Sequence, residues 1–204
     1  MQKPYKRIEG NLYQLQDPAQ AQKEADAEKF YDQGLYAKES GCPDAALAFY
    51  RKALSLAPAF VSAWINLGTL QCNRRNFLEA RTCYYRAVRV DPNSGLAWFN
   101  IANILEYEGY FEEAVDCYQR ALAVSSEYVD AHYNLALVYR RLGEYRKEAK
   151  HFALYLKYTK SQDCFSKEAQ ATLKRLKKKD LCLVQKLPSR VTHSERSIPL
   201  IMEG

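Results

Sequence analysis

Residues 61–94 read VSAWINLGTLQCNRRNFLEARTCYYRAVRVDPNS, and residues 95–128 read GLAWFNIANILEYEGYFEEAVDCYQRALAVSSEY. The two segments match when one is shifted along the other by 34 residues. The shift pairs Trp64 with Trp98, Leu67 with Ile101, Gly68 with Ala102, Phe77 with Phe111, Ala80 with Ala114, Cys83 with Cys117, Tyr84 with Tyr118 and Ala87 with Ala121. A fixed period of this length indicates a repeat architecture, in which each unit packs on its neighbours.

The period extends in both directions and defines four repeats, at 27–60, 61–94, 95–128 and 129–162. We number the positions of each repeat from 1 to 34. The recurring pattern has a bulky residue at position 4, a small one at 8, Ala at 20, an aromatic at 24, Ala at 27 and Pro at 32. This pattern resembles the tetratricopeptide repeat. The resemblance implies an all-α solenoid of antiparallel helix pairs, closed by a C-terminal capping helix.

The terminal repeats depart from the pattern, as expected for the ends of an array. Gln33 and Ala37 replace larger apolar residues in the first repeat, whereas Glu148, Tyr155 and Lys160 stand in the fourth where Ala, Ala and Pro are usual.

Each repeat is expected to form an A helix and a B helix. The A helices are expected near 18–40, 61–74, 95–108 and 129–142, and the B helices near 44–57, 78–91, 112–125 and 146–159. Small residues at positions 8 and 20 let the two helices approach closely, and larger side chains there would cost about 1–3 kcal/mol. Glycine stands at three of the four A-to-B turns, where a left-handed residue ends the helix. Arg75 stands at the fourth, so we expect that turn to be less well capped.

Three segments lie outside the repeats. Residues 1–17 form an N-terminal extension with no clear period, and the first helix begins near Pro18, ahead of the formal repeat. Residues 163–180 are expected to contain the capping helix, with Ser166 as its N-cap and Ala169, Leu173 and Leu176 as its apolar stripe. Residues 181–204 are expected to be a flexible tail.

Bulk composition limits the possible functions. The chain has 204 residues and a net charge of +6, and no apolar run of about 18 residues that would span a membrane. No secretory signal is evident and the six cysteines form no C-x-x-C pair, so we expect reduced thiols and a cytoplasmic protein. The three histidines (132, 151 and 193) sit in unrelated local settings, which argues against a metal site. Because no catalytic motif is present, we expect neither an enzyme nor a cofactor.

The resemblance implies that positions 2, 5, 6, 9, 12 and 13 of the A helices line a concave groove. Position 6 then carries a column of amides beside a column of large apolar side chains at position 5. A side-chain amide offers two donors and one acceptor, which can pair with a peptide unit without selecting its side chain. The candidate peptide-binding residues are Tyr31, Ile65, Asn66, Phe99, Asn100, Asn103, Tyr133, Asn134, Arg140 and Arg141. The alternative is that the amides bond to neighbouring helices or to water.

Two further interpretations of the candidate residues remain open at this stage. Arg140 and Arg141 could take an acidic ligand residue, or they could favourably oppose the dipole at the end of their helix. Tyr31 and Tyr133 could contact a ligand, or they could fill gaps between repeats.

One partner class is argued against. Related domains hold the C-terminal carboxylate of Hsp70 or Hsp90 with a clamp of Lys, Asn, Asn, Lys and Arg. The corresponding positions here are Tyr31, Leu35, Asn66, Leu96 and Asn100, or, one repeat later, Ile65, Thr69, Asn100, Asp130 and Asn134. The cationic residues are missing, so we expect no carboxylate-clamp binding.

A basic patch is expected on the capping helix, formed by Lys174, Arg175, Lys177, Lys178 and Lys179. It could contact nucleic acid or an anionic membrane. No aromatic residue follows Phe165, so the stacking platform of single-strand binders is missing. We therefore favour a solvated helix face.

These observations favour a non-enzymatic adaptor or scaffold that binds a segment of a partner protein in its groove. The alternatives are a dedicated chaperone of the type III secretion kind and a regulatory module of a transcription or signalling complex.

Overall fold

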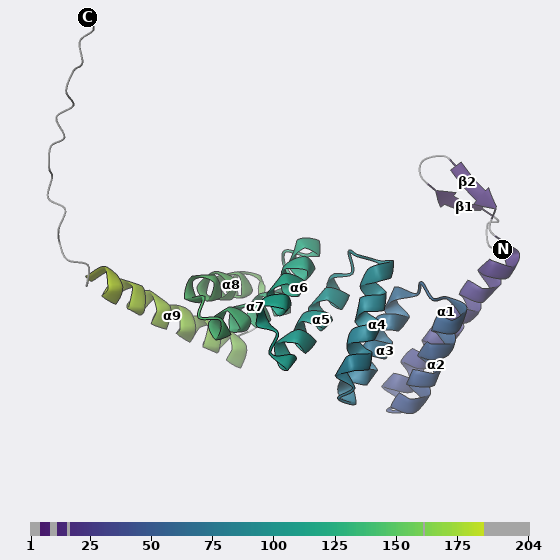
Figure 1. Ribbon diagram of the computed structural model, residues 1–204, viewed down its shortest axis with the longest axis horizontal. Coiled ribbons are helices and arrows are strands. Elements are labelled where there is room, and N and C mark those ends of the chain that lie inside the picture. Colours follow the sequence, from purple (N-terminus) through teal and green to yellow (C-terminus); the bar gives the residue numbers. More distant parts are fainter. Residues whose placement is uncertain (1–4, 9–11, 16, 161, 186–204) are drawn as a thin grey trace, which may run out of the picture.

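The computed structural model describes residues 5–8, 12–15, 17–160 and 162–185, with side chains from 17–160 and 162–178. Within these residues the fold is a linear array of helices (Figure 1). The helices are α1 (Pro18–Glu39), α2 (Pro43–Leu56), α3 (Val61–Asn73), α4 (Phe77–Val90), α5 (Gly95–Glu108), α6 (Phe111–Val124), α7 (Val129–Arg141), α8 (Tyr145–Tyr158) and α9 (Cys164–Gln185). The helices follow one another along the array, and its first and last helices lie at opposite ends.

The described helices form four pairs, as the period of 34 residues predicts, and α9 packs on the last pair. Each helix contacts its partner in the same repeat most extensively and the next repeat less so. Every B helix begins and ends one residue earlier than expected. The predicted cap of α1 is confirmed, since the Asp17 carboxylate accepts a hydrogen bond from the Ala19 N–H at 3.0 Å.

Two features differ from the expectation at the ends of the chain. Residues 5–15 contain an antiparallel hairpin of β1 (Tyr5–Ile8) and β2 (Leu12–Leu15), with Tyr5 opposite Leu15. The sequence pattern of this extension predicts no such pair of strands. Helix α9 begins at Cys164 and continues to Gln185, so the expected tail starts five residues late, and the rest of it, 186–204, lies outside the described residues.

The start of α9 is capped differently from the prediction. The Asp163 carboxylate accepts a hydrogen bond from the Ser166 N–H at 2.9 Å, so Asp163 and not Ser166 caps the helix. Ser166 is instead buried, and its hydroxyl lies 3.5 Å from that of Tyr155.

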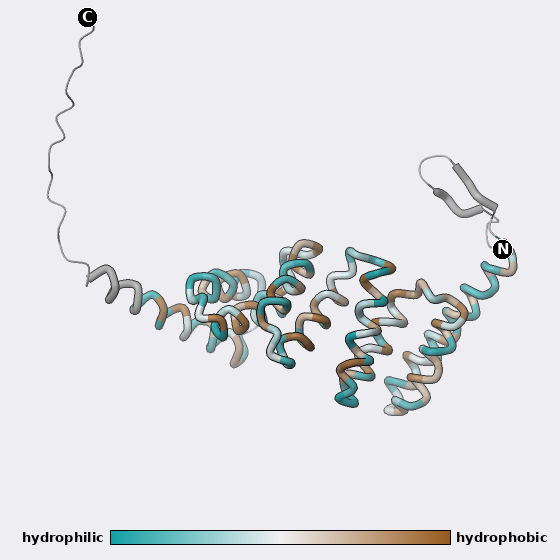
Figure 2. The backbone as a smooth tube through the Cα atoms, viewed as in Figure 1, coloured by the Kyte–Doolittle hydropathy of each residue, from teal (hydrophilic) through white to brown (hydrophobic). Residues whose placement is uncertain are grey.

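The core runs along the whole array without a single centre. Hydrophobic and hydrophilic residues alternate along the helices, as expected for helices that each bury one stripe (Figure 2). The predicted close approach of A and B helices is confirmed at position 8. A Cβ atom on Gly34 would lie 2.5 Å from Cε1 of Tyr50, and one on Gly68 would lie 2.7 Å from Cε1 of Tyr84.

The A-to-B turns share one backbone conformation. Gly41, Gly109 and Gly143 have φ angles of 73°, 88° and 75°. Arg75 adopts the same left-handed conformation, with φ 62°, and its N–H donates to the Cys72 carbonyl at 2.9 Å. The turn therefore keeps its geometry without glycine.

Candidate peptide-binding groove

We call the surface formed by positions 2, 5, 6, 9, 12 and 13 of the A helices the groove face. Helix α5 contacts α7 directly, and a hydrogen bond between Asn66 and Tyr31 joins α3 to α1. At these two places, candidate residues from neighbouring repeats lie close together.

The amide column is partly engaged within the protein. Asn66 donates a hydrogen bond from Nδ2 to the hydroxyl of Tyr31 at 2.8 Å. Tyr31 stands at position 5 of the preceding repeat, and its ring packs on Phe60 with the centroids 4.8 Å apart. This pair therefore joins repeat one to repeat two.

The same relationship recurs at the other end of the array. Tyr133, also at position 5, donates its hydroxyl to Glu168 Oε2 at 2.7 Å. If the period were extended by one repeat, Glu168 of α9 would occupy position 6. Helix α9 thus occupies the place of a fifth A helix.

The middle of the column lacks this bond because position 5 carries no hydroxyl there. Ile65 precedes Asn100 and Phe99 precedes Asn134 in the corresponding pairs. Asn134 donates instead to Asn103 Oδ1 at 2.9 Å. Asn100, which is partly exposed, is the one asparagine of the column with no hydrogen-bond partner among the described residues.

Asn103 belongs to a polar cluster with Tyr118 and Glu106, two residues that were not among the predicted site residues. The buried Tyr118 hydroxyl lies 2.6 Å from Asn103 Oδ1 and 2.7 Å from Glu106 Oε2. Burial raises the pKa of the Glu106 carboxyl, opposed by the hydrogen bond from Tyr118 and by the charge of Arg141. Glu106 stands at position 12, which is one of the groove positions. Its place in the repeat could therefore have identified it as a candidate residue from the sequence alone. Asn103, Glu106 and Arg141 line a cavity of about 520 Å³ together with Tyr107, Glu108, Gly109 and Phe111.

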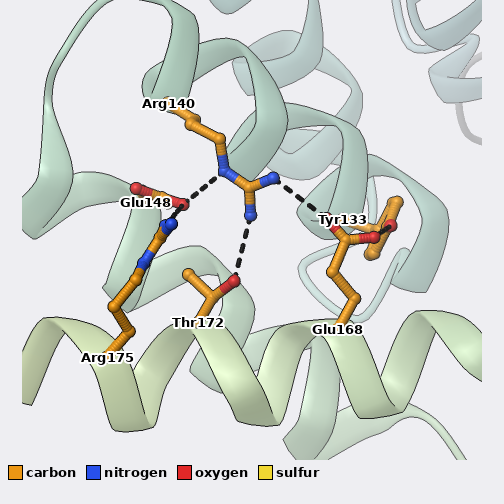
Figure 3. A network of polar contacts seen from close by, with 6 residues as sticks. All are labelled: Tyr133, Arg140, Glu148, Glu168, Thr172 and Arg175. Carbon is orange, nitrogen blue, oxygen red and sulfur yellow. Dashed lines mark hydrogen bonds and ion pairs between the residues drawn. The ribbon is translucent and has the colours of Figure 1, made fainter.

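Two candidate residues must be reassigned, because α9 covers them (Figure 3). The Arg140 guanidinium donates to Glu148 Oε1 at 2.7 Å, to Glu168 Oε1 at 2.9 Å and to the Thr172 hydroxyl at 3.1 Å. Tyr133 is 9% exposed and bonded to Glu168. Arg140 therefore holds the capping helix, a role that neither interpretation of the sequence anticipated, while Arg141 remains exposed on the groove face.

The basic patch lies on the outer surface of α9. Lys174, Lys177 and Lys178 are exposed. Arg175 is also exposed, and its guanidinium lies 4.0 Å from Glu148 Oε1. The side chain of Lys179 lies outside the described residues.

Two of the three histidines are in contact, which contradicts the expectation that their settings are unrelated. Nδ1 of His132 lies 3.1 Å from Nδ1 of His151, and Nε2 of His132 lies 2.9 Å from the Ser126 carbonyl. The two histidines are 19 residues apart in the sequence, so their contact was not expected. They meet because position 4 of the A helix faces position 23 of the B helix. No group of three or more metal-binding side chains occurs among the described residues.

A second cavity, of about 450 Å³, opens on the groove face beside α9. It is lined by Phe99, Val129, Asp130, Tyr133, Asn134, Tyr155, Thr159, Asp163 and Phe165. No helix in the described part of the chain is both long enough and apolar enough to cross a bilayer.

Comparison with known families identifies the repeat. Residues 31–94 match the family model described as tetratricopeptide repeat, and residues 103–143 match the one described as TPR repeat. The chain is a tetratricopeptide repeat (TPR) protein. A search of curated protein sequences gives no significant match.

Solved structures of TPR proteins share this fold. A crystal structure of MamA protein is 22% identical, with a TM-score of 0.63, over 82% of this chain and 98% of that one. YrrB, a TPR protein with an unusual peptide-binding site, is 18% identical, with a TM-score of 0.64, over 80% and 84%. The first TPR of Spaghetti (RPAP3), bound to the HSP90 peptide SRMEEVD, is 19% identical, with a TM-score of 0.57, over 59% and 95%. At these identities the likeness concerns the fold.

Proposed function

We propose that this TPR protein is a non-enzymatic adaptor that binds an extended segment of a partner protein on its groove face. The observation that carries the proposal is the unpartnered side chain of Asn100. The amide is partly exposed and has no hydrogen-bond partner among the described residues, so it remains able to pair with a ligand backbone.

The surroundings of Asn100 suit a peptide. Phe99 and Ile65 lie on the same face and are partly exposed, so they offer apolar contacts to ligand side chains. One cavity is lined by Asn103, one turn along α5 from Asn100, and the other by Phe99, which adjoins Asn100 in the sequence; residues of α7 line both. The region proposed for binding is therefore repeats two to four, centred on α5.

The absence of carboxylate-clamp binding remains part of the proposal. The three clamp positions that require cations carry Tyr31, Leu96 and Asn100 in one frame and Ile65, Asp130 and Asn134 in the other. The Spaghetti domain, whose structure contains the peptide SRMEEVD, is a suitable positive control. An affinity of this chain for that peptide comparable to the Spaghetti domain would refute the exclusion.

We also place the protein in the cytoplasm. The five cysteines with described side chains (42, 72, 83, 117 and 164) are unpaired, as is usual in a reducing compartment. Burial raises the pKa of the Cys83 and Cys117 thiols to about 11, so both behave as packing residues.

The test is a selection from a random 12-residue peptide display library, followed by affinity measurements on the selected peptides. Asn100→Ala should weaken binding about five- to tenfold, as expected for one lost hydrogen bond, and leave the melting temperature unchanged. Asn66→Ala is the matched control, because its amide is used internally; it should cost about 1 kcal/mol of stability. If Asn100→Ala binds the selected peptides as tightly as the wild type does, Asn100 makes no hydrogen bond to the ligand that contributes to binding.

A further inference from the structure

The cavity beside α9 differs in chemistry from the rest of the groove face. We call it the aromatic–acidic pocket, formed by Phe99, Tyr133, Asn134, Tyr155 and Phe165 with Asp130 and Asp163. It combines four aromatic rings, one each from α5, α7, α8 and α9, with two carboxylates in a volume of about 450 Å³. Such a combination needs a ligand group that is attracted both to ring faces and to negative charge.

The rings form a preorganised wall. The ring centroids of Tyr133 and Phe165 lie 5.2 Å apart with the planes at 76°, and those of Tyr133 and Tyr155 lie 5.1 Å apart. Tyr133 is fixed by its hydrogen bond to Glu168, so the wall does not depend on a ligand for its shape. Phe165 is 51% exposed, which leaves much of its surface available for contact.

The charges that line the pocket are all negative. Among the described residues that line it, Asp130 and Asp163 are the only carboxylates, and none is a lysine or an arginine. Lys157, Lys160 and Lys167, the nearest cations along the chain, are exposed and do not line the pocket. Arg140 is held by Glu148 and Glu168. The pocket is thus locally acidic on a chain whose net charge is +6.

We propose that this pocket receives a lysine or arginine side chain of the peptide bound on the groove face. The cation would lie against the aromatic faces, which attract positive charge, and would pair with Asp130. Neighbouring A helices are about 8–10 Å apart, so the basic residue would lie about three residues from the peptide unit held by Asn100. This inference rests on the proposed function and specifies its ligand.

Asp130 is the residue to change. It is exposed on α7 and makes no hydrogen bond or ion pair among the described residues, so its removal should not disturb the fold. Asp163 is unsuitable because its carboxylate caps α9. Glu28 is the matched control, since it is an exposed acid at the same repeat position 2 but lines none of the described cavities.

The experiment starts from the peptides selected with the full chain. Their arginine or lysine is replaced in turn by citrulline or norleucine, which keep the length of the side chain but lose its charge. We expect the selected peptides to share one basic position. Replacing that residue by its neutral substitute should weaken the binding of the peptide to the wild-type protein about tenfold. Asp130→Asn should weaken binding of the basic peptide about fivefold and that of the neutral peptide little. Glu28→Gln should bind as the wild type does.

The outcomes separate this inference from the proposed function. If no peptide is selected, both proposals fail. Suppose instead that peptides are selected and their binding depends on Asn100. If they share leucine or phenylalanine in place of a basic residue, or bind Asp130→Asn as well as the wild type, only the proposal of a cationic side chain in the pocket is refuted. Self-association that Asp130→Asn abolishes, measured by light scattering, would identify a second copy as the occupant and would also refute it.

Discussion

The middle repeats and the fourth repeat place different residues at the same positions, and the neighbouring element explains why. Position 20 is Ala80 and Ala114 in the middle repeats, both fully buried, but Glu148 in the fourth, also fully buried. There the carboxylate pairs with Arg140, which also bonds to α9. A departure that suggests a weakened repeat is thus part of the contact that holds the capping helix.

Position 4 shows the same scaffold bond made by different chemistry. Trp64 and Trp98 donate from Nε1 to the carbonyls of Pro58 and Pro92, each at 2.8 Å. In the fourth repeat His132 Nε2 makes the equivalent bond to Ser126 at 2.9 Å. This bond requires the proton on Nε2, so Nδ1 of His132 accepts from Nδ1–H of His151.

The cation at position 26 changes together with position 4. Arg86 and Arg120 lie over the rings of Trp64 and Trp98, with the guanidinium carbon 6.0 Å and 4.8 Å from the ring centroids. Leu154 occupies this position in the fourth repeat, where position 4 is His132. The substitution avoids placing a fixed cation over a ring that can itself become charged.

The largest effect is expected from Arg140→Met. It leaves the fully buried Glu148 with Arg175, 4.0 Å away, as its remaining cation, so we expect the free energy of unfolding to fall by about 3 kcal/mol. We also expect the amides of α9 to exchange faster than in the wild type, because Arg140 no longer bonds to this helix. Chemical denaturation gives the first quantity, and hydrogen exchange of α9 amides gives the second.

Arg141→Met is the matched control, because that neighbouring arginine is exposed; it should change stability by less than about 0.5 kcal/mol. The double variant Arg140→Met, Glu148→Ala restores the alanine of the middle repeats and should be more stable than Arg140→Met alone. If the double variant is the less stable of the two, the buried charge is not the cause.

A smaller effect tests how closely the middle repeats are packed. Gly68→Ala places a Cβ atom 2.7 Å from Cε1 of Tyr84, so we expect a loss of about 1–3 kcal/mol by thermal or chemical denaturation. Ala102→Gly at the same position of repeat three is the control, and should cost about 2 kcal/mol through helix propensity and the loss of a buried methyl group, without any overpacking. A gain in stability for Gly68→Ala would mean that Tyr84 moves aside at little cost.

Most of the array could be predicted from the sequence, because each 34-residue sequence repeat folds into one helix pair that packs on the next pair. The helix boundaries follow from small residues and turn glycines that each repeat carries. The assignments that changed depend on contacts between repeats. Asn66 is engaged because Tyr31 carries a hydroxyl, and Asn100 is not because Ile65 does not. The equivalence of α9 to an A helix, which covers Tyr133 and Arg140, appears only when the helices are placed in space.

The next effect depends on pH and belongs to the fourth repeat. Burial, reinforced by the charges of His132 and Lys150, lowers the pKa of His151 to about 4. The unfolded chain binds this proton near pH 6.5, so between pH 6.5 and 4 the unfolded state holds more protons and stability falls as the pH falls. We expect a loss of about 1–2 kcal/mol between pH 7 and pH 4, discounted because His151 is partly exposed.

The pH effect has its own matched variant. His151→Cys introduces the residue found at position 23 of both middle repeats, and should remove most of the loss above pH 4.5. Below that, loss of the Glu168 bonds adds a further decrease, because its pKa is lowered by hydrogen bonds from Tyr133 and Arg140. Denaturation curves at several pH values measure both. An unchanged pH profile in His151→Cys would assign the effect elsewhere.

The smallest effect concerns the turn that lacks glycine. Arg75 holds φ 62°, a conformation that costs a residue with a side chain about 1 kcal/mol, whereas the other three turns use glycine. Arg75→Gly removes this strain but adds freedom to the unfolded chain, so the net gain in stability should be about 0.5 kcal/mol. Gly109→Arg, the reverse change in repeat three, should lose about as much, since a Cβ there would contact nothing within 4 Å. If Arg75→Gly is destabilising, the arginine side chain contributes more than its backbone costs, and the middle repeats are less alike than their sequences suggest.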